Sequence, residues 1–292
     1  MSSAKEIRDR INGIGETKKI TTAMYLIAST KMRRVRAGLE RTRPYFDALQ
    51  QEVRRMFRAA ESVDSKFFFA DENVVPTPVG AMIITADKGL AGGYNVNVIK
   101  AAEKLLRRFP DSKLYVVGEH GKHYFSQHGI AIEEDFNYSA DDPTVHMARA
   151  ICSRLLSDLH SGKIKSLYLV YTDIRGTGET VKTRRLVPFH RSALKEDEDP
   201  EAPSADFEYM PSIGAILENV VLSYLTGFIY SALVDSYCSE LTARMEAMNA
   251  ANDNADEMLA ELKLNYQRAR QGSITSEITE ISSGAKHKRS SK

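Results

Sequence analysis

Apolar side chains recur at alternating spacings of four and three residues near the beginning of the chain. This pattern starts at Ile7 and ends at Ala60, and 13 of its 16 positions are apolar, Tyr25 among them. An apolar period of 3.5 residues kept over many turns is typical of a coiled coil, because the stripe of a globular helix is wider and drifts. The pattern therefore predicts a helical rod over residues 1–61. Pro44 lies inside this stretch and should bend or interrupt the helix, since proline removes one backbone hydrogen bond.

The same spacing returns from Ile213 to Ser276 near the end of the chain. Here 14 of 19 positions are apolar, and Pro211 with Ser212 before them is typical of a helix start. We therefore expect a second helical rod over residues 212–283. A helix of this length cannot bury its apolar stripe inside a small domain, so it needs another helix to pack against, and the first rod is available.

The stretch between the rods has a different pattern, in which short β-rich runs alternate with helical stretches. The predicted strands are 79–85, 113–117 and 166–171, and the predicted helices are 96–109, 121–127 and 144–160. This alternation predicts a Rossmann-like α/β domain over residues 75–190 with a mostly parallel sheet. Residues 180–189 suit a final edge strand, and Gly176 and Gly178 suit a hairpin before it. An acidic loop follows at residues 191–211.

The fold class that follows is α/β with a long antiparallel two-helix coiled coil, formed by the N- and C-terminal helices around the central domain. The rods are antiparallel because one compact domain joins the end of the first to the start of the second. If paired residue numbers sum to about 273, Thr21 faces Asn252 and Phe46 faces Gly227. Polar side chains then meet polar ones, and a large ring meets the smallest residue. In this register the second rod is longer, and its end from Ser273 onward projects alone.

Composition narrows the class of protein. The 292 residues include 40 Lys and Arg against 39 Asp and Glu, and this balance argues against a general nucleic-acid binder. Cys152 and Cys238 are too few for a disulfide-stapled secreted fold. The charged opening lacks the apolar core of a signal peptide, and the uncharged stretch Asn219–Val234 is shorter than the ~20 residues of a membrane-spanning helix. We therefore expect a soluble protein of the cytoplasmic type.

Charge is unevenly distributed along the chain. Residues 1–60 carry 14 basic and 6 acidic side chains, residues 213–281 carry 4 basic and 10 acidic ones, and residues 284–292 form a basic tail. The first two stretches could attract each other, contact different partners, or be solvated independently. A basic cluster in the first stretch consists of Lys31, Arg33, Arg34 and Arg36. It is either a solvated helix surface or an electrostatic contact with acidic loops of a partner around the rod.

Candidate chemistry is sparse. The sequence ADKGLAGGYN over residues 86–95 lies between a predicted strand and a predicted helix, where Gly-rich loops bind phosphate. It lacks the ending of a P-loop and the spacing of a dinucleotide fingerprint, so a tight turn and an anion site are alternatives. His120, His123 and His128 form a run that occasionally binds metal, but no Cys or second carboxylate pair lies near it. We therefore expect no catalytic, cofactor-binding or metal-binding residue.

Several motifs resemble those of a known family. The opening AKEIRDRINGIGETKKITTAMYLIASTKMRRVR and the closing ARMEAMNAANDNADEMLAELKLNYQRARQGSITSEITEISSGA are similar to the ends of gamma subunits of F-type ATP synthases. The middle segments ADKGLAGGYN, VGEHGKHYF and RRLVPF also resemble that family, in the same order. Chance similarity between coiled coils would reproduce the heptads but not ITSEITEI or NAANDNADEM.

The resemblance implies a non-catalytic rotary subunit of a proton-translocating ATP synthase. This central rotor stalk would couple rotation of the membrane c-ring to conformational changes in the alpha and beta subunits during ATP synthesis or hydrolysis. Its partners would be three alpha and three beta subunits, an epsilon subunit and the c-ring, with no cofactor, no nucleic acid and no direct membrane insertion. Because a transit peptide and a chloroplast-type dithiol insertion are lacking, we expect a peripheral position on the cytoplasmic face of a bacterial cell membrane.

The resemblance also implies roles for particular residues. Met24 and the basic cluster would lie near acidic loops of the beta subunit. Polar contacts higher in the ring of alpha and beta subunits would come from Arg244, Arg270, Gln271, Thr275 and Glu280. The apolar tip formed by Ile274, Ile278 and Ile281 would turn in a sleeve that acts as a bearing. Tyr25 departs from the family, which usually has an acidic residue there.

Two other classes of protein share part of this pattern. An unrelated scaffold or adaptor with a coiled-coil stalk and an α/β head would share the heptads, but it gives no reason for the terminal motifs. A nucleotide-dependent enzyme built on the middle domain would need phosphate-binding and acid–base residues that the sequence does not show.

Overall fold

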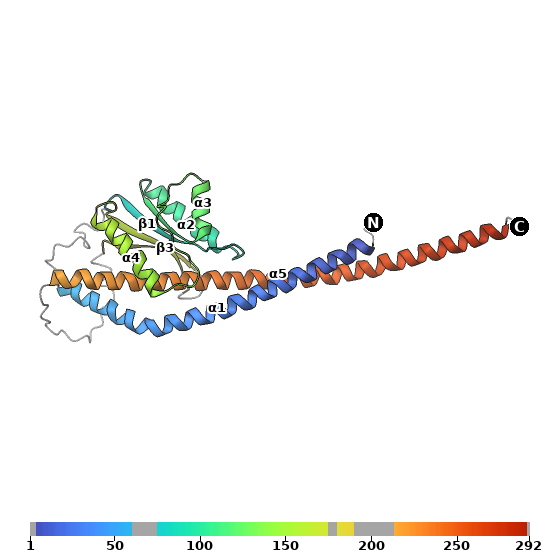
Figure 1. Cartoon of the computed structure of the whole chain (residues 1–292), viewed down its shortest axis with the longest axis horizontal. Coiled ribbons are helices and arrows are strands. Elements are labelled where there is room, and N and C mark those ends of the chain that lie inside the picture. The colour runs from blue at the N-terminus through green and yellow to red at the C-terminus, as the bar shows by residue number, and fades with distance from the viewer. Residues whose placement is uncertain (1–3, 60–74, 175–179, 190–212, 291–292) are drawn as a thin grey trace. The chain divides into compact units, whose positions relative to one another are not determined.

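The computed structural model describes residues 4–59, 75–174, 180–189 and 213–290 (Figure 1). The predicted acidic loop, the hairpin glycines Gly176 and Gly178, and most of the segment between the first rod and the middle domain lie outside these residues. The chain divides into two compact units. Residues 1–28 and 244–292 form the first unit, and residues 29–243 form the second.

Two long helices account for both predicted rods and pass from one unit into the other. They are α1 (Ala4–Ala59) and α5 (Ile213–Ser290). α1 continues through Pro44 as one helix, so of the two predicted effects of this proline, a bend or an interruption, the interruption is absent. Pro44 is exposed, so water can satisfy the carbonyl of Glu40 that loses its helical partner. α5 continues past residue 283 through most of the predicted basic tail.

In the first unit the two helices pair in antiparallel orientation along a row of partly buried side chains. The Thr21 hydroxyl donates a hydrogen bond of 2.5 Å to the side-chain oxygen of Asn252, and Lys18 forms an ion pair with Asp256. Ala28, in the same row, is only 1% exposed. The pairing of Thr21 with Asn252 confirms the predicted register in this unit.

The structure corrects the prediction at one heptad position. Tyr25 is 37% exposed, whereas the neighbouring Met24 is half-buried. Because one helical turn takes about 3.6 residues, positions 24 and 25 lie on opposite sides of the line from Thr21 to Ala28, and either could point inward. The thioether of Met24 takes the inner place.

The second unit contains a four-stranded sheet with the strand order β2-β1-β3-β4. The strands are β1 (Val79–Ile84), β2 (Lys113–Val117), β3 (Ser166–Asp173) and β4 (Thr180–Val187). β1 pairs in parallel with β2 and β3, and β4 pairs antiparallel with β3 at the edge. The remaining helices are α2 (Tyr94–Arg108), α3 (Glu119–Gln127) and α4 (Val145–His160). The predicted α/β domain with a mostly parallel sheet and a final edge strand is therefore confirmed.

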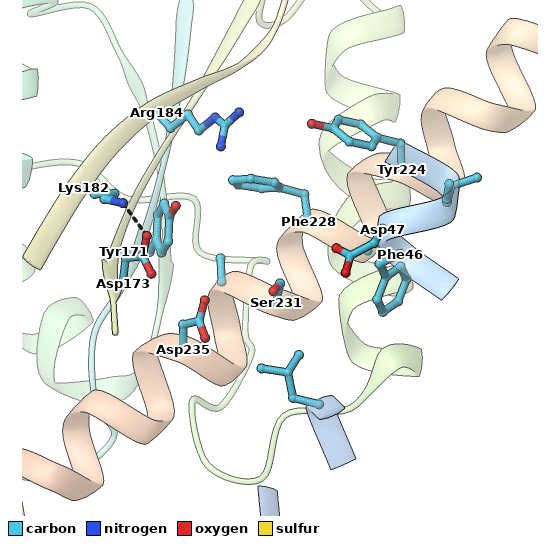
Figure 2. A pocket seen from close by; sticks show the side chains of 14 residues that line it. Phe46, Asp47, Tyr171, Asp173, Lys182, Arg184, Tyr224, Phe228, Ser231 and Asp235 are labelled. Atoms are coloured by element: carbon cyan, nitrogen blue, oxygen red, sulfur yellow. Dashed lines mark hydrogen bonds and ion pairs between the residues drawn. The ribbon is translucent and has the colours of Figure 1, made fainter. Parts of the chain in front are cut away.

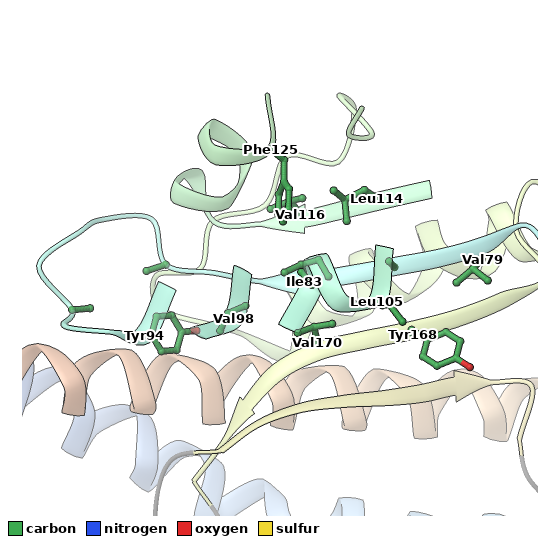
Figure 3. Packing of buried hydrophobic residues seen from close by; sticks show 14 residues of the cluster. Val79, Ile83, Tyr94, Val98, Leu105, Leu114, Val116, Phe125, Tyr168 and Val170 are labelled. Atoms are coloured by element: carbon green, nitrogen blue, oxygen red, sulfur yellow. The ribbon is translucent and has the colours of Figure 1, made fainter. Parts of the chain in front are cut away.

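One face of the sheet is covered by α2. Figure 3 shows Val98 and Leu105 of this helix packed against Ile83, Val116 and Val170, which come from the three parallel strands. All five side chains are at most 5% exposed. Burial of these apolar side chains stabilises the domain. The loops at the strand ends are not needed for this core and can carry polar groups.

The opposite face of the sheet is covered by α4 and α5. The Tyr115 hydroxyl of β2 donates a hydrogen bond of 2.7 Å to the Asp158 carboxylate of α4. The ring of Tyr171 on β3 meets that of Phe228 on α5 edge to face, with centroids 6.0 Å apart. Within this unit α5 therefore lies between the sheet and α1 (Figure 1).

This position buries α5 on nearly all sides in the second unit. Gly227 faces Phe46 of α1 so closely that a Cβ atom there would overlap the ring, which confirms the predicted register in this unit as well. By length and composition α5 could cross a membrane from Asn219 onward, but 67% of its most apolar window is buried inside the protein. Packing against α1 and the sheet accounts for the apolar character of this stretch.

Candidate functional site

The glycine-rich loop after β1 is a tight strand-to-helix turn. Leu90 and Gly92 both have left-handed backbone conformations, with φ of 61° and 50°. The side-chain oxygen of Asn95, in the first turn of α2, accepts a hydrogen bond of 2.9 Å from the amide of Ala86. This bond closes the loop onto the end of the strand.

The carboxylate of Asp87, in the same loop, occupies the polar edge that an anion would need. It accepts hydrogen bonds from the amides of Glu119, Ala140 and Asp141 at 3.0 to 3.1 Å, and from the hydroxyl of Ser139. Donors from the start of α3 and from the loop at residues 139–141 therefore converge on a negative charge that belongs to the protein and would repel a phosphate. Of the two interpretations of this loop, the tight turn is the one that the geometry confirms.

Asp141, one of the residues held by Asp87, joins three elements of the second unit. Its carboxylate accepts a hydrogen bond of 2.6 Å from the Tyr237 hydroxyl of α5. The Nζ of Lys31 on α1 lies 3.0 Å from each carboxylate oxygen and 6.0 Å from the centre of the Tyr237 ring. We call Lys31, Asp87, Asp141 and Tyr237 the Asp141 junction.

The Asp141 junction holds its groups in the protonation states that its bonds require. Burial raises the pKa of Asp141, but hydrogen bonds from Tyr237 and Lys31 outweigh it, so the pKa of this carboxyl lies below its usual value. Burial, followed by the hydrogen bond to Asp141, raises the pKa of the Tyr237 hydroxyl. At neutral pH the carboxylate is therefore ionised and the hydroxyl keeps its proton.

Two members of the predicted basic cluster contact acidic side chains of this chain, those of Asp141 and Asp142. Lys31 binds Asp141. Arg34 lies 4.0 Å from Asp142, and the side chains of Arg34 and Asp142 are largely exposed. The exposed members of the cluster are Lys31, Arg33, Arg34 and Arg36. Contact with acidic side chains is thus present within the chain, and contact with acidic loops of a partner stays a prediction.

Sequence reasoning missed the acidic half of this junction. Lys31 and Asp141 are 110 residues apart, and only the folded domain brings them together. The available signal was the pair of adjacent acids, Asp141 and Asp142, directly before Pro143. Such a sequence is typical of a turn, and a turn at the edge of a sheet presents its side chains to neighbouring helices.

The predicted contact residues near the end of α5 are exposed. They are Arg270, Gln271, Thr275 and Glu280, whereas Arg244 and Met24 are half-buried. Ile274, Ile278 and Ile281 are 46%, 62% and 74% exposed. Within the described residues α1 begins at Ala4, which the register pairs with Ala269, and every residue of α5 from 270 to 283 is exposed.

α1 carries an exposed apolar surface in the first unit that was not predicted. Ile20 is 61% exposed, and Leu26 and Ile27 are each 58% exposed. Ile20 and Ile27 are two turns apart and therefore lie on the same side of the helix. Large apolar side chains gathered on one exposed helix side are typical of a surface that contacts another protein.

Figure 2 shows a pocket of about 290 Å³ in the second unit, between α1, α5 and the strands β3 and β4. Phe46 and Phe228 line it, and two of its basic side chains make contacts within the chain. Lys182 pairs with Asp173, and the guanidinium of Arg184 lies 4.9 Å from the centre of the Phe228 ring. The first contact joins β4 to β3, and the second joins β4 to α5. Among the described residues, no group of three or more His, Cys, Asp or Glu could hold a metal ion.

Comparison with known proteins gives matches over nearly the whole chain. A family model described as ATP synthase matches residues 3–287. The chain is 38% identical to the ATP synthase gamma chain of Caldanaerobacter subterraneus subsp. tengcongensis, over 96% of this chain and 98% of the relative. It is 37% identical to the ATP synthase gamma chain of Caldicellulosiruptor saccharolyticus, over 96% of each chain.

Solved structures show the same fold at lower identity. A chain of the Euglena gracilis mitochondrial ATP synthase in rotational state 3 superposes with a TM-score of 0.62 at 14% identity, over 95% of this chain and 92% of that one. A chain of the Tetrahymena thermophila mitochondrial ATP synthase central stalk and c-ring gives a TM-score of 0.56 at 22% identity, over 80% of this chain and 99% of that one.

Proposed function

This chain belongs to the ATP synthase gamma chain family, and on that premise we propose that it is the central rotor stalk of an F-type ATP synthase. Its rotation couples a membrane c-ring to conformational changes in surrounding alpha and beta subunits, during ATP synthesis or hydrolysis. The catalytic sites belong to those subunits, and this chain contributes none of its own. It lies peripherally on the cytoplasmic face of a bacterial membrane, beside an epsilon subunit.

The unequal length of the helical pair carries this proposal. In the first unit α5 extends past the first described residue of α1 and is exposed from Arg270 to Ser283. Three isoleucines lie there, and a single helix with such exposed side chains needs a surrounding surface to cover them. A ring of alpha and beta subunits supplies that surface, and Ile274, Ile278 and Ile281 form the tip that turns within it.

The tip must be held without being locked to its sleeve. The Thr275 hydroxyl donates to the carbonyl of Gln271 at 2.9 Å, and the Thr279 hydroxyl donates to the carbonyl of Thr275 at 2.8 Å. These hydroxyls are therefore satisfied within the helix, and the isoleucines make contacts that have no preferred direction. Such a surface can rotate against a sleeve with small barriers.

Rotation changes nucleotide affinity only if the sides of the shaft differ. In the first unit α1 exposes Ile20 and Ile27, whereas α5 exposes carboxylates such as those of Asp253 and Glu257. At any angle, three equivalent catalytic subunits then meet three different surfaces. The difference in contact free energy shifts each subunit toward a different conformation, and this is the physical basis of the coupling.

Polar contacts with the ring follow from the same arrangement. The exposed arginines of the basic cluster face acidic loops of the beta subunit, and Met24, whose side chain points inward, lies near the same loops. The contacts higher in the ring come from Arg244, Arg270, Gln271, Thr275 and Glu280. Lys31 contributes less to the partner surface, because its ammonium already binds Asp141.

Co-assembly with alpha and beta subunits tests this function. We expect the purified chain alone neither to hydrolyse ATP nor to bind it tightly, and the complex assembled further with the membrane sector to couple hydrolysis to ion pumping. Truncation after Gln271 removes the isoleucine tip and should weaken assembly or coupling. Truncation after Gly284 keeps the tip and is the matched control. Substantial ATPase activity of the pure chain, or full coupling after truncation at Gln271, would overturn the proposal.

A further inference from the structure

We propose that the Asp141 junction is the joint that carries torque between the α/β domain and the two long helices. This inference rests on the proposed function, because torque arises only in a rotating stalk. It assigns a mechanical role to Lys31, Asp141, Tyr237 and the supporting Asp87. None of these residues touches a catalytic site, so they are positioning residues.

The bonding pattern at Asp141 resists twisting of one helix about the other. α1 donates from Lys31 and α5 donates from Tyr237, and both donors meet the same carboxylate, at 3.0 and 2.6 Å. Turning α1 about α5 lengthens at least one of these bonds. Hydrogen bonds to an ionised group are directional and roughly twice as strong as neutral ones. The apolar contacts between α1 and α5 fix the spacing of the helices but lack this directionality.

The loop that carries the Asp141 carboxylate is itself held by Asp87 of the α/β domain. The amides of Ala140 and Asp141 and the hydroxyl of Ser139 all donate to the carboxylate of Asp87. Asp87 follows β1, which lies between β2 and β3 inside the sheet. A force applied to Asp141 is therefore passed to an internal strand and not to a free loop.

The junction also lies near the end of the second unit in both helices. Lys31 follows the unit boundary after residue 28 in α1, and Tyr237 precedes the boundary after residue 243 in α5. Close to it, a Cβ atom on Gly92 of the α/β domain would lie 3.6 Å from the carbonyl oxygen of Ala243. Both helices are thus gripped just before they continue into the first unit.

Stabilisation of the fold alone is a poor explanation for this arrangement. The side chains of Lys31 and Asp141 are 45% and 41% exposed. Ion pairs at this exposure contribute little to the free energy of unfolding, because water competes for both charges. Their removal should leave the melting temperature almost unchanged, so a mechanical role and a stabilising role predict different measurements.

Single-molecule rotation of the assembled complex tests the joint. The alpha and beta subunits are fixed to a surface, a bead is attached to the α/β domain of this chain, and its angular variance is recorded during catalytic pauses. Lys31→Gln and Asp141→Asn should each raise the variance about twofold if the charge-assisted bonds supply half of the restoring torque. The double variant should be no softer than the softer single one, because both changes break the same bond.

Matched variants separate the joint from general damage. Arg41→Gln removes another exposed cation from α1 and should leave the variance at the wild-type value. The charge exchange Lys31→Glu with Asp141→Lys should return the variance toward wild type. Tyr237→Phe removes one hydroxyl and keeps the ring, so it should soften the joint less than Lys31→Gln does. If the variants that change a charge fail to assemble, Tyr237→Phe is the decisive variant.

The outcomes distinguish this inference from the proposed function. Variance in Lys31→Gln and Tyr237→Phe equal to that of Arg41→Gln, in complexes that still rotate, would overturn the joint and leave the rotor standing. Absence of rotation in the wild-type complex would overturn the rotor itself. A fall in melting temperature without a change in variance would assign the junction to folding and not to torque.

Discussion

The two compact units use the same pair of helices in different ways. In the second unit α5 is enclosed by the sheet and α1, and the ring of Phe46 packs against Gly227 so closely that a Cβ atom on that residue would overlap it. In the first unit the pair is joined by half-exposed polar contacts, such as that of Thr21 with Asn252, and α5 then continues alone. One heptad spacing thus supports a tightly packed anchor in one unit and an exposed shaft in the other.

The difference shows that heptad spacing sets which residues face each other but not how firmly they are held. Firmness depends on what covers the remaining sides of the helices. In the second unit the α/β domain covers α5, so every side-chain volume matters. In the first unit the outer sides are exposed, and a rotor would use them for its partners.

The largest effect should come from filling the space at Gly227. In Gly227→Leu the new side chain must displace Phe46, and overpacking of this kind costs about 3 kcal/mol. Urea unfolding of the full chain measures the loss. Phe46→Ala added to Gly227→Leu should restore part of it, since the small residue then lies on the other helix. An unchanged unfolding midpoint in Gly227→Leu would show that the helices are not packed in this register.

A smaller effect is expected from removing one buried hydroxyl in the second unit. In Tyr115→Phe the carboxylate of Asp158 loses its 2.7 Å donor while it stays 8% exposed, which should cost about 1–2 kcal/mol. Thr21→Val is the matched change in the first unit, where water can replace the lost donor to Asn252. Its cost should be within about 0.5 kcal/mol. Equal costs, measured by thermal unfolding, would remove the contrast between the units.

The same contrast predicts a substitution that stabilises the protein. Gly13 lies in α1 in the first unit, and a Cβ atom there would meet no neighbour within 4 Å. Gly13→Ala should therefore raise helix stability by about 0.5–1 kcal/mol through backbone entropy alone. Hydrogen exchange of the amides around residue 13 measures this directly. Gly272→Ala, at an equally open position of α5, is a second test, and slower exchange is expected there too.

Much of the fold was predictable because it depends on local periodicity. The alternation of β-rich and helical stretches specified the sheet, and matching Thr21 to Asn252 and Phe46 to Gly227 was enough to find the register. Tyr25 was misplaced because two adjacent positions of a helix are nearly equivalent with respect to the partner. The helix periodicity alone cannot decide which of the two side chains points toward the partner helix.

The candidate site was predictable only in part, for a physical reason of another kind. The isoleucine tip was predicted from the resemblance to the family, and the register added that the end of the helix from Ser273 onward projects alone. The Asp141 junction was not, because its geometry depends on Asp87, whose carboxylate gathers a loop more than fifty residues away. Ile20 and Ile27 were missed as well, since heptad analysis follows the inner side of a helix and ignores the outer one.

The smallest effect concerns acid stability of the second unit. Because the pKa of Asp141 is lower in the folded state, its contribution is fully present above the unfolded value of about 3.9 and is lost as pH falls through the folded pKa. Asp141→Asn should therefore lower the urea midpoint slightly at neutral pH and reduce its dependence on pH below about 5, by no more than about 1 kcal/mol.

Tyr237→Phe gives the complementary limb of the same measurement. The pKa of Tyr237 is raised on folding, so its contribution is present below the unfolded value of about 10 and is lost at higher pH. This variant should change the alkaline limb and should also weaken the acid limb, because it removes one of the two hydrogen bonds that lower the pKa of Asp141. Thr21→Val alters a pair without a titratable group and should leave the shape of both limbs unchanged. A parallel shift of the whole profile in Asp141→Asn, with its acid slope intact, would show that the carboxylate is not held by Lys31 and Tyr237 in solution.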